Sequence, residues 1–239
     1  MRRAFWLEAS MFTALVYIAT VAIQVYQPAT GGYFNLGEAV IYLAAMMSSP
    51  LVAGLAGGIG AALADATTGF SIFAPGTLVI KFAEGVVAGY LSRSIRKFST
   101  VVQKASMFTA MILYGVLVAI LGFKYLSGKA SLGTAWSSIM VEIPGLTWIA
   151  VGAIVSLAIA LLYVRKLLGV EASPLLLAGL IMVIGYFLYE YFVSNPLTGR
   201  PPEDAIAEIP INIGQAAIGA SIASLLAGFL KKAGYLAEE

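Results

Sequence analysis

Residues 144–165 have the sequence PGLTWIAVGAIVSLAIALLYVR, in which no charged side chain comes before the last residue. An apolar run of about 20 residues is long enough to cross a bilayer as a helix. Similar runs recur along the 239-residue chain, which is 60% hydrophobic and only 11% charged, with a mean hydropathy of +0.93. A soluble domain carries about 25% charged residues. The sequence therefore predicts an all-α, polytopic membrane helix bundle that forms a single domain over residues 1–239.

Eight hydrophobic segments are predicted to be helices. The second and third are short and are separated by Pro50, so a single kinked helix, which leaves seven crossings, is the alternative. The basic N-terminus resembles a signal peptide, but its apolar run continues to about Tyr26 without a small-residue cleavage site, and we expect it to remain as the first helix. The predicted ranges are 5–26, 37–48, 50–66, 76–93, 104–123, 144–165, 174–193 and 206–230.

The basic residues decide between eight crossings and seven. Eight crossings place ten of them on the side that holds both termini and three on the other, whereas seven would separate the N-terminal arginines from the other basic segments. The positive-inside rule therefore favours eight crossings with both termini in the cytoplasm. The ten are Arg2, Arg3, Arg93, Arg96, Lys97, Lys104, Arg165, Lys166, Lys231 and Lys232, and the three are Lys124, Lys129 and Arg200.

The composition also excludes several classes of function. The chain has no cysteine and no histidine, which removes disulfides, thiol nucleophiles, imidazole bases and most transition-metal sites. Its net charge of +2 is too small to suggest nucleic acid as a partner. It contains no phosphate-binding loop and no motif of a hydrolase. We therefore expect no enzyme activity, no metal and no cofactor.

Polar residues inside membrane helices are costly and usually face a cavity or a partner. Asn35 and Glu38 follow a Gly-rich loop, either to cap the second helix or to contact a ligand. Asp65 lies near the end of the third helix, where an interfacial position is the simpler interpretation. Lys81 and Glu84 share one face of the fourth helix, as a structural ion pair or as the wall of a cavity.

The last two predicted helices carry further polar groups. Tyr186 and Glu190 are four residues apart on one face, with Tyr186 deep enough to stack on a flat ligand, while Tyr189 and Tyr191 fit an aromatic belt. In the segment 208–215, Asn212 and Gln215 also share a face. Their carboxamides either form hydrogen bonds with neighbouring helices or form hydrogen bonds with the polar edge of a heterocyclic ligand. With the topology above, all these groups lie in the outer half of the membrane. That asymmetry favours a binding site open to the outside over a continuous ion path.

Five segments in order resemble a known family. They are residues 35–45 (NLGEAVIYLAA), 50–65 (PLVAGLAGGIGAALAD), 77–89 (TLVIKFAEGVVAG), 183–190 (VIGYFLYE) and 209–219 (IPINIGQAAIG). Together they resemble the S components of energy-coupling-factor (ECF) vitamin transporters, of the riboflavin-type branch. The resemblance implies a membrane subunit that binds a vitamin from outside and associates with a transmembrane coupling subunit and two cytosolic ATPases.

The resemblance also implies roles for single residues. The Pro-x-Asn segment of the last helix provides ligand contacts, here Asn212 and Gln215, although some riboflavin-type members have a lysine at the position of Gln215. The small-residue face of the first helix docks on the coupling subunit, here at Ser10 and Ala14. The family has six helices, so we expect residues 1–95 and 172–232 to form the S-component-like core and residues 102–168 to be an inserted helix pair.

We therefore hypothesise a binding subunit for a vitamin or related flat heterocycle, with riboflavin as the default, in the cytoplasmic membrane of a prokaryote. The cavity is expected between the fourth and the last two helices, under the loop 27–37. The alternative is a stand-alone secondary transporter in which Glu84 or Glu190 carries a proton. The predicted ligand contacts are Phe34, Asn35, Glu38, Lys81, Glu84, Tyr186, Glu190, Asn212 and Gln215.

Overall fold

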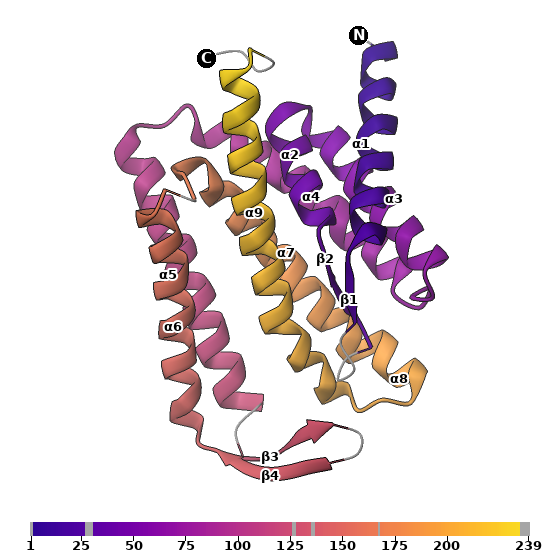
Figure 1. The fold of residues 1–239 in the computed structure, drawn as a ribbon, viewed down its shortest axis with the longest axis vertical. Helices are drawn as coiled ribbons and strands as arrows, with labels where there is room; N and C mark the ends of the chain where they lie inside the picture. The colour runs from indigo at the N-terminus through magenta and orange to yellow at the C-terminus, as the bar shows by residue number, and fades with distance from the viewer. Residues whose placement is uncertain (1, 27–30, 126–127, 135–136, 167, 235–239) are drawn as a thin grey trace.

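Long helices that run in alternating directions make up most of the described chain (Figure 1). The computed structural model describes residues 2–26, 31–125, 128–134, 137–166 and 168–234. Within these ranges, eight helices have eleven residues or more, as the sequence predicts. They are α1 (Arg2–Ala22), α2 (Gly37–Met47), α3 (Pro50–Thr67), α4 (Ala74–Ile95), α5 (Thr100–Tyr125), α6 (Gly145–Val164), α7 (Ser173–Tyr189) and α9 (Glu208–Lys232).

Short elements connect these helices. The strands form two antiparallel pairs, β1 with β2 and β3 with β4. The π-helical turn η2 continues α7 directly, and α8 follows it before the chain turns back into α9. Their bounds are β1 (Gln24–Tyr26), β2 (Tyr33–Asn35), β3 (Gly128–Thr134), β4 (Ser137–Ile143), η1 (Val170–Ala172), η2 (Glu190–Ser194), α8 (Asn195–Thr198) and η3 (Pro202–Ala207).

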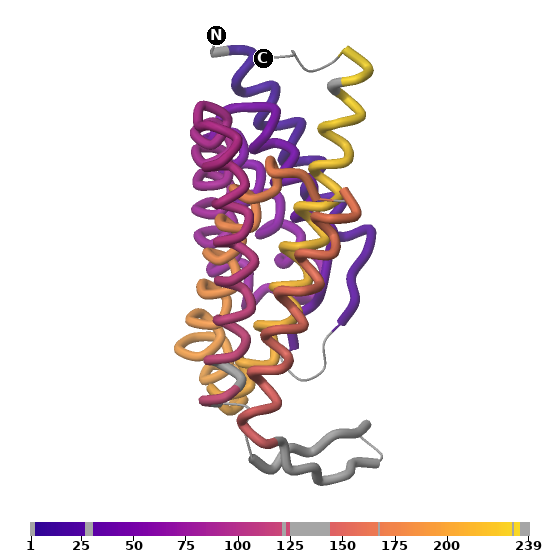
Figure 2. Tube along the Cα trace, turned by 90° about the vertical axis from the view of Figure 1, so that its left-hand side faces the viewer, coloured from indigo at the N-terminus to yellow at the C-terminus, as the bar shows by residue number. Residues whose placement is uncertain are grey.

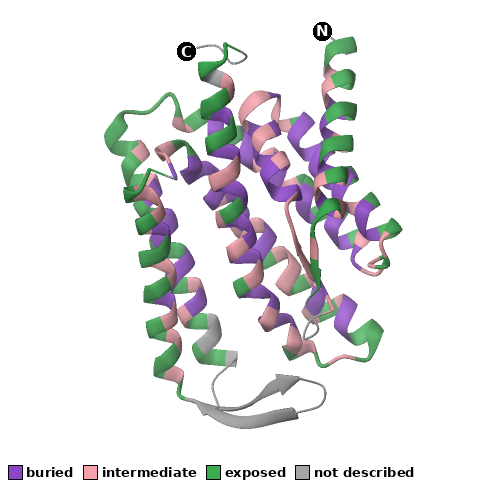
Figure 3. Ribbon diagram, in the orientation of Figure 1, coloured by how far each residue is buried: buried purple, intermediate pink, exposed green. Residues whose placement is uncertain are grey.

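Six stretches of the described chain are long and apolar enough to cross a membrane: 3–22, 50–67, 100–120, 145–164, 170–198 and 202–230. Of the other two long helices, α2 is too short and α4 carries Lys81 and Glu84 among its buried residues. The outer faces of the bundle are apolar and exposed, for example at Trp6, Leu157 and Phe192 (Figure 3). Such a surface is suited to lipid, and the chain is a multi-pass membrane protein.

One predicted boundary is wrong. The first helix was expected to continue to Tyr26, but α1 ends at Ala22 and the chain then becomes the strand β1. Val25 of β1 pairs with Phe34 of β2 in an antiparallel register. Hydropathy misses this change because residues 23–26 are nearly as apolar as the helix before them. The break between the second and third helices is where it was expected: Ser49 accepts a hydrogen bond from the Val52 N–H, 3.2 Å, and Pro50 begins α3.

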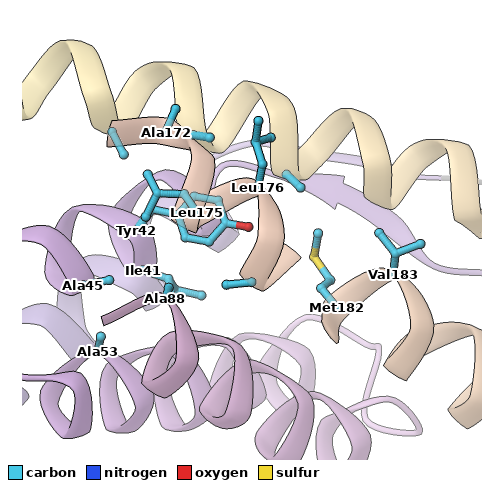
Figure 4. Close-up of a cluster of buried hydrophobic side chains, with 14 of the residues drawn as sticks. Ile41, Tyr42, Ala45, Ala53, Ala88, Ala172, Leu175, Leu176, Met182 and Val183 are labelled. Carbon is cyan, nitrogen blue, oxygen red and sulfur yellow. The ribbon is translucent and has the colours of Figure 1, made fainter. Parts of the chain in front are cut away.

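The core lies mainly among α1, α2, α3, α4, α7 and α9. One face of α5 also contributes to it, through Met107, Ala110, Met111, Tyr114 and Val118. Small residues on α3 and α4 let these two helices approach closely, and larger side chains of α2 and α7 fill the centre. Figure 4 shows part of this core, where Ile41 and Tyr42 of α2 meet Leu175, Leu176 and Met182 of α7. All five side chains are fully buried.

The helices α5 and α6 form a pair at one side of this core (Figures 1 and 2). They pack mainly on each other, and it is α5 that contacts α7 and η1. Gly115 and Gly152 make the contact between the pair close, because a Cβ on Gly152 would lie only 2.3 Å from the Gly115 carbonyl oxygen. Ser156 adds a hydrogen bond across the pair, from its hydroxyl to the Met111 carbonyl at 2.9 Å. This peripheral position fits the predicted inserted pair, which stays a prediction.

Both chain ends lie at one end of the bundle, where α1 begins and α9 ends (Figure 1). Most of the described basic residues belong to segments at that same end; Lys81, Lys124 and Arg200 do not. Arg93 donates hydrogen bonds to the carbonyls of Gly89 and Ser48, and Arg96 donates to Met46 at 3.2 Å, so the two arginines bind the carboxyl end of α2. The side chains of Arg2, Lys129 and Lys231 lie outside the described residues.

Candidate substrate-binding site

A small cavity of about 30 Å³ lies towards the end of the bundle opposite the termini. The alternating helix directions create it, because the carboxyl ends of α1, α3 and α7 meet the amino ends of α4 and α9 there, and β2 closes one side. The residues around it come from each of these elements: Thr20, Gly32, Tyr33, Asn35, Ala61, Asp65, Phe73, Thr77, Lys81, Tyr186, Glu190, Glu208, Asn212 and Gln215.

Lys81 of α4 is the centre of a buried ionic cluster. Its ammonium donates to Glu38 of α2 and to Glu84 one turn further along α4, the latter at 3.1 Å. Tyr42 donates to the other oxygen of Glu84 at 2.8 Å, and the ammonium also lies 5.7 Å from the ring centroid of Tyr186. The side chains of Lys81, Glu38 and Glu84 are at most 3% exposed. The predicted pair therefore exists, and a second carboxylate joins it.

Asp65 is the centre of a second polar network. Its two oxygens accept hydrogen bonds from the hydroxyls of Tyr33 and Thr77, and the Thr77 hydroxyl lies 2.9 Å from that of Tyr186. Burial, and then the nearby charge of Asp65, raise the pKa of Tyr33 on β2, so its phenol keeps the proton that it donates. The network connects β2, α3, α4 and α7, and the face of Phe70 packs against Tyr33 at 4.3 Å between ring centroids.

The carboxamide of Gln215 joins α9 to the start of α2. Its Oε1 accepts a hydrogen bond from the Asn35 N–H at 3.0 Å, and its Nε2 donates to Glu38 at 3.4 Å. Asn35 in turn accepts from the Gly37 N–H at 2.9 Å, a bond to the first residue of α2, although the N-cap position predicted for Asn35 is held by Leu36. Gly219 permits this approach of α2 to α9, because a Cβ there would lie 2.8 Å from Cβ of Glu38.

Three buried polar atoms at the cavity have no hydrogen-bond partner. They are Oγ1 of Thr20, Oε2 of Glu190 and Nδ2 of Asn212, on side chains that are 1%, 1% and 4% exposed. Most buried polar atoms in folded proteins are satisfied, and an unsatisfied one costs about 1–3 kcal/mol. Glu190 is also the first residue of the π-helical turn η2, a distortion often found at functional sites. A hydroxyl that can donate or accept, a carboxyl oxygen and an amide donor therefore surround the cavity without a partner among the described residues.

The comparison with protein families identifies this arrangement. A model of the family "ECF-type riboflavin transporter, S component" matches residues 7–165. The chain belongs to this family. Members are the membrane subunits that bind a vitamin for an ECF transporter, and they work with coupling and ATPase modules. The match runs through α5 and α6 and ends before α7, so the division into a core and an inserted pair stays a prediction.

A curated relative of this S component comes from Pyrococcus woesei. It is named "Uncharacterized protein in gap 3'region" and is 41% identical over 86 residues. These residues are 36% of the present chain and 57% of the relative, so the chain spans little more than half of the relative's length.

The structure brings six of the nine predicted ligand contacts of the S component to the cavity. Glu38 and Glu84 lie behind Lys81 and hold it in place. Phe34 lies elsewhere: alternate residues of a strand face opposite ways, and its neighbours on β2 line the cavity. We therefore do not place Phe34 among the contacts. The six are Asn35, Lys81, Tyr186, Glu190, Asn212 and Gln215.

Five polar residues at the cavity were not predicted as contacts. Asp65 was noticed in the sequence but interpreted as an interfacial residue, and Glu208 was noticed as part of the segment 208–215. Thr20, Tyr33 and Thr77 gave no signal beyond being polar residues within apolar or Gly-rich segments. The predicted loop 27–37 does contribute Gly32, Tyr33 and Asn35, while residues 27–30 lie outside the described residues.

Proposed function

We propose that this S component is the high-affinity binding subunit for a vitamin or related flat heterocycle in the cytoplasmic membrane of a prokaryote. It imports the ligand together with an ECF coupling subunit and two cytosolic ATPases. The observation that carries the proposal is the set of unpartnered buried polar atoms around one cavity. Riboflavin, which the family description names, is the first ligand to test.

The proposed site faces the outside of the cell. The described basic side chains Arg93, Arg96, Lys97, Arg165 and Lys166 lie at the end of the bundle that holds the termini. The positive-inside rule assigns that end to the cytoplasm. The cavity is at the other end, so a ligand enters from outside, and the subunit must change its orientation or its docking to release the ligand inside.

The proposed contacts divide by chemistry. Asn212 and Gln215 bond the polar edge of the ligand, Tyr186 packs on its ring, and Glu190 complements its charge, while Lys81 lines the cavity between Glu38 and Glu84. The cavity of about 30 Å³ has room for about one water, whereas sites for small organic ligands measure roughly 300–1,000 Å³. Ligand binding therefore includes rearrangement of the side chains that now meet across the cavity.

The proposed docking surface for the coupling subunit includes Ser10 and Ala14. Both residues are exposed on the outer face of α1, four residues apart, so a partner helix can approach the backbone there. Ser10→Leu together with Ala14→Leu should abolish co-purification with the coupling subunit and leave ligand binding unchanged. Ile18→Ala, a truncation on the same exposed face, is the matched control.

The decisive experiment is native mass spectrometry of the purified protein for a co-purified ligand, followed by a vitamin panel in a tryptophan-quenching assay. A bound small molecule supports the proposal, and an isoalloxazine absorbance identifies a flavin. Absence of any co-purified ligand and of any quenching would contradict it.

Uptake in cells without the coupling subunit and ATPases tests the alternative function. Uptake that is abolished both by an uncoupler and by Glu84→Gln would establish a proton-coupled transporter instead.

A further inference from the structure

The charge of the Lys81 ammonium is already compensated by carboxylates of the protein, so it is not available to a ligand. The ammonium is the one cation among the described residues that line the cavity, and it is bound by both Glu38 and Glu84. All three side chains are buried, so their charges interact strongly. This cluster alone carries more negative than positive charge. An anionic group on a ligand would have to compete with two carboxylates that are already in contact with the ammonium.

The opposite wall of the cavity is also acidic. Glu190 and Glu208 both line it. Arg200 is a cation beside this wall, on the turn between α8 and η3. Its guanidinium packs against Gly31, where a Cβ would lie 2.8 Å away. One arginine thus lies beside a wall with two carboxylates.

Asp65 adds a third carboxylate to the lining, and its hydrogen-bond donors are the neutral hydroxyls of Tyr33 and Thr77. The cavity and its immediate support therefore hold five carboxyl groups against two cations. Excess negative charge in a buried site is costly without a compensating positive charge. Among the described residues, Oε1 of Glu38 and Oε2 of Glu190 are buried without a hydrogen-bond partner, and of these two residues only Glu190 lines the cavity.

We propose that the ligand of this S component is an organic cation: a flat heterocycle with a protonated amine or a quaternary ring nitrogen that binds against Glu190. This inference rests on the function proposed above and narrows its substrate class. The described residues contain no group of three acidic, histidine or cysteine side chains able to hold a metal ion, which favours an organic cation. Phe73, Tyr33 and Tyr186 supply ring surfaces at the cavity that suit a flat cation.

Asn212 indicates that the ligand also carries a hydrogen-bond acceptor. Its unpartnered Nδ2 is a hydrogen-bond donor, so it requires an acceptor, while Oε2 of Glu190 requires a donor or a positive charge. Asn212 lies on α9 and Glu190 at the end of α7, and both line the same cavity. The ligand that satisfies both therefore has a cationic end and an acceptor, such as a ring nitrogen or a carbonyl oxygen.

The test compares cationic with neutral ligands; the first two pairs below differ mainly in charge, and the third adds a larger cationic and a larger neutral vitamin. Binding to the purified full chain is measured by tryptophan quenching and thermal shift with 1-methylnicotinamide against nicotinamide, pyridoxamine against pyridoxine, and thiamine against riboflavin. In each pair the first molecule is cationic and the second is not. Each cation that binds should bind at least about tenfold more tightly than its neutral partner, since hydrogen bonds to charged groups are the stronger ones.

Glu190→Gln removes the charge with almost no change in shape. It should weaken the cations about 10- to 100-fold, which is what losing one charged hydrogen bond costs, and should leave neutral molecules unchanged. Glu203→Gln is the control, because Glu203 is exposed in η3 and does not line the cavity. The thermal midpoint without ligand shows whether each variant is folded.

The outcomes separate this inference from the proposed function. If riboflavin or another neutral molecule binds as tightly as its cationic partner, or if Glu190→Gln does not weaken a bound cation, the cationic class is wrong and the binding function stands. If no molecule in the panel binds and none co-purifies, both proposals fail. A co-purified molecule that carries no positive charge also overturns the cationic class alone.

Discussion

Replacing Lys81 by Met should destabilise the ligand-free protein severely. The substitution keeps an unbranched side chain of similar length in place and removes only the ammonium. Glu38 and Glu84, which are 1% and 0% exposed, then lie next to each other with no cation between them. Tyr42 still donates to Glu84, but one neutral hydrogen bond does not replace the ammonium.

The expected size of the effect follows from this burial. Removing one partner of a buried ion pair costs about 3–5 kcal/mol, because the remaining charge is left uncompensated. For a chain of this length, such a loss lowers the thermal midpoint by roughly 6–20 °C. The same argument predicts that stability recovers in the triple variant Glu38→Gln/Lys81→Met/Glu84→Gln. This variant has no buried charge left in the cluster, so most of the lost stability should return.

The assay is thermal unfolding in detergent, followed by tryptophan fluorescence, on the parent, the single variant and the triple variant. Lys97→Met is the matched control, since Lys97 is exposed in the turn after α4 and its replacement should change little. A single variant within about 2 °C of the parent, a shift at least about threefold smaller than expected, would refute the argument. So would a triple variant no more stable than the single one.

Three further predictions follow from other contacts. Tyr33→Phe removes a donor to Asp65 and should lower stability by about 1–3 kcal/mol, measured by thermal unfolding. Gly152→Leu places a side chain where Gly115 approaches, so it should separate α5 from α6 and abolish a disulfide engineered between them. Arg93→Met leaves the carbonyl at the end of α2 without its charged donor and should cost about 1.5–3 kcal/mol in the same unfolding assay.

Many residues of the candidate site could be predicted because the direction of each helix determines the depth of its residues in the membrane. Once eight segments alternate across a membrane, residues near the end of one helix and the start of the next lie at the same depth. The sequence therefore brings Lys81, Glu190 and Asn212 to one end of the bundle, and the structure places them around one cavity. Depth, however, does not say which helices are neighbours, since that depends on lateral packing between segments far apart in the chain.

The features that the sequence did not reveal have the same physical origin. The contact of Lys81 with Glu38 requires α2 to pack beside α4, which the period of either helix alone does not reveal. Phe34 was assigned to the ligand because it is aromatic and close in sequence to Asn35. In a strand, a shift of one residue changes the face, and only the pairing of β2 with β1 shows that a strand is there at all.

The short length of α2 explains why a polar site exists at this depth. Its 11 residues rise only about 16 Å, roughly half of the hydrocarbon core. The described residues of β1 and β2 lie next to the bundle without helical hydrogen bonds, and their pairing satisfies part of that backbone. Irregular backbone within a membrane protein is tolerated only where it is buried in protein or lines a cavity. Tyr33 and Asn35 of β2 line the cavity, and the Asn35 N–H bonds to Gln215, so this short strand is what brings backbone polar groups beside the three unpartnered side-chain atoms of the proposed site.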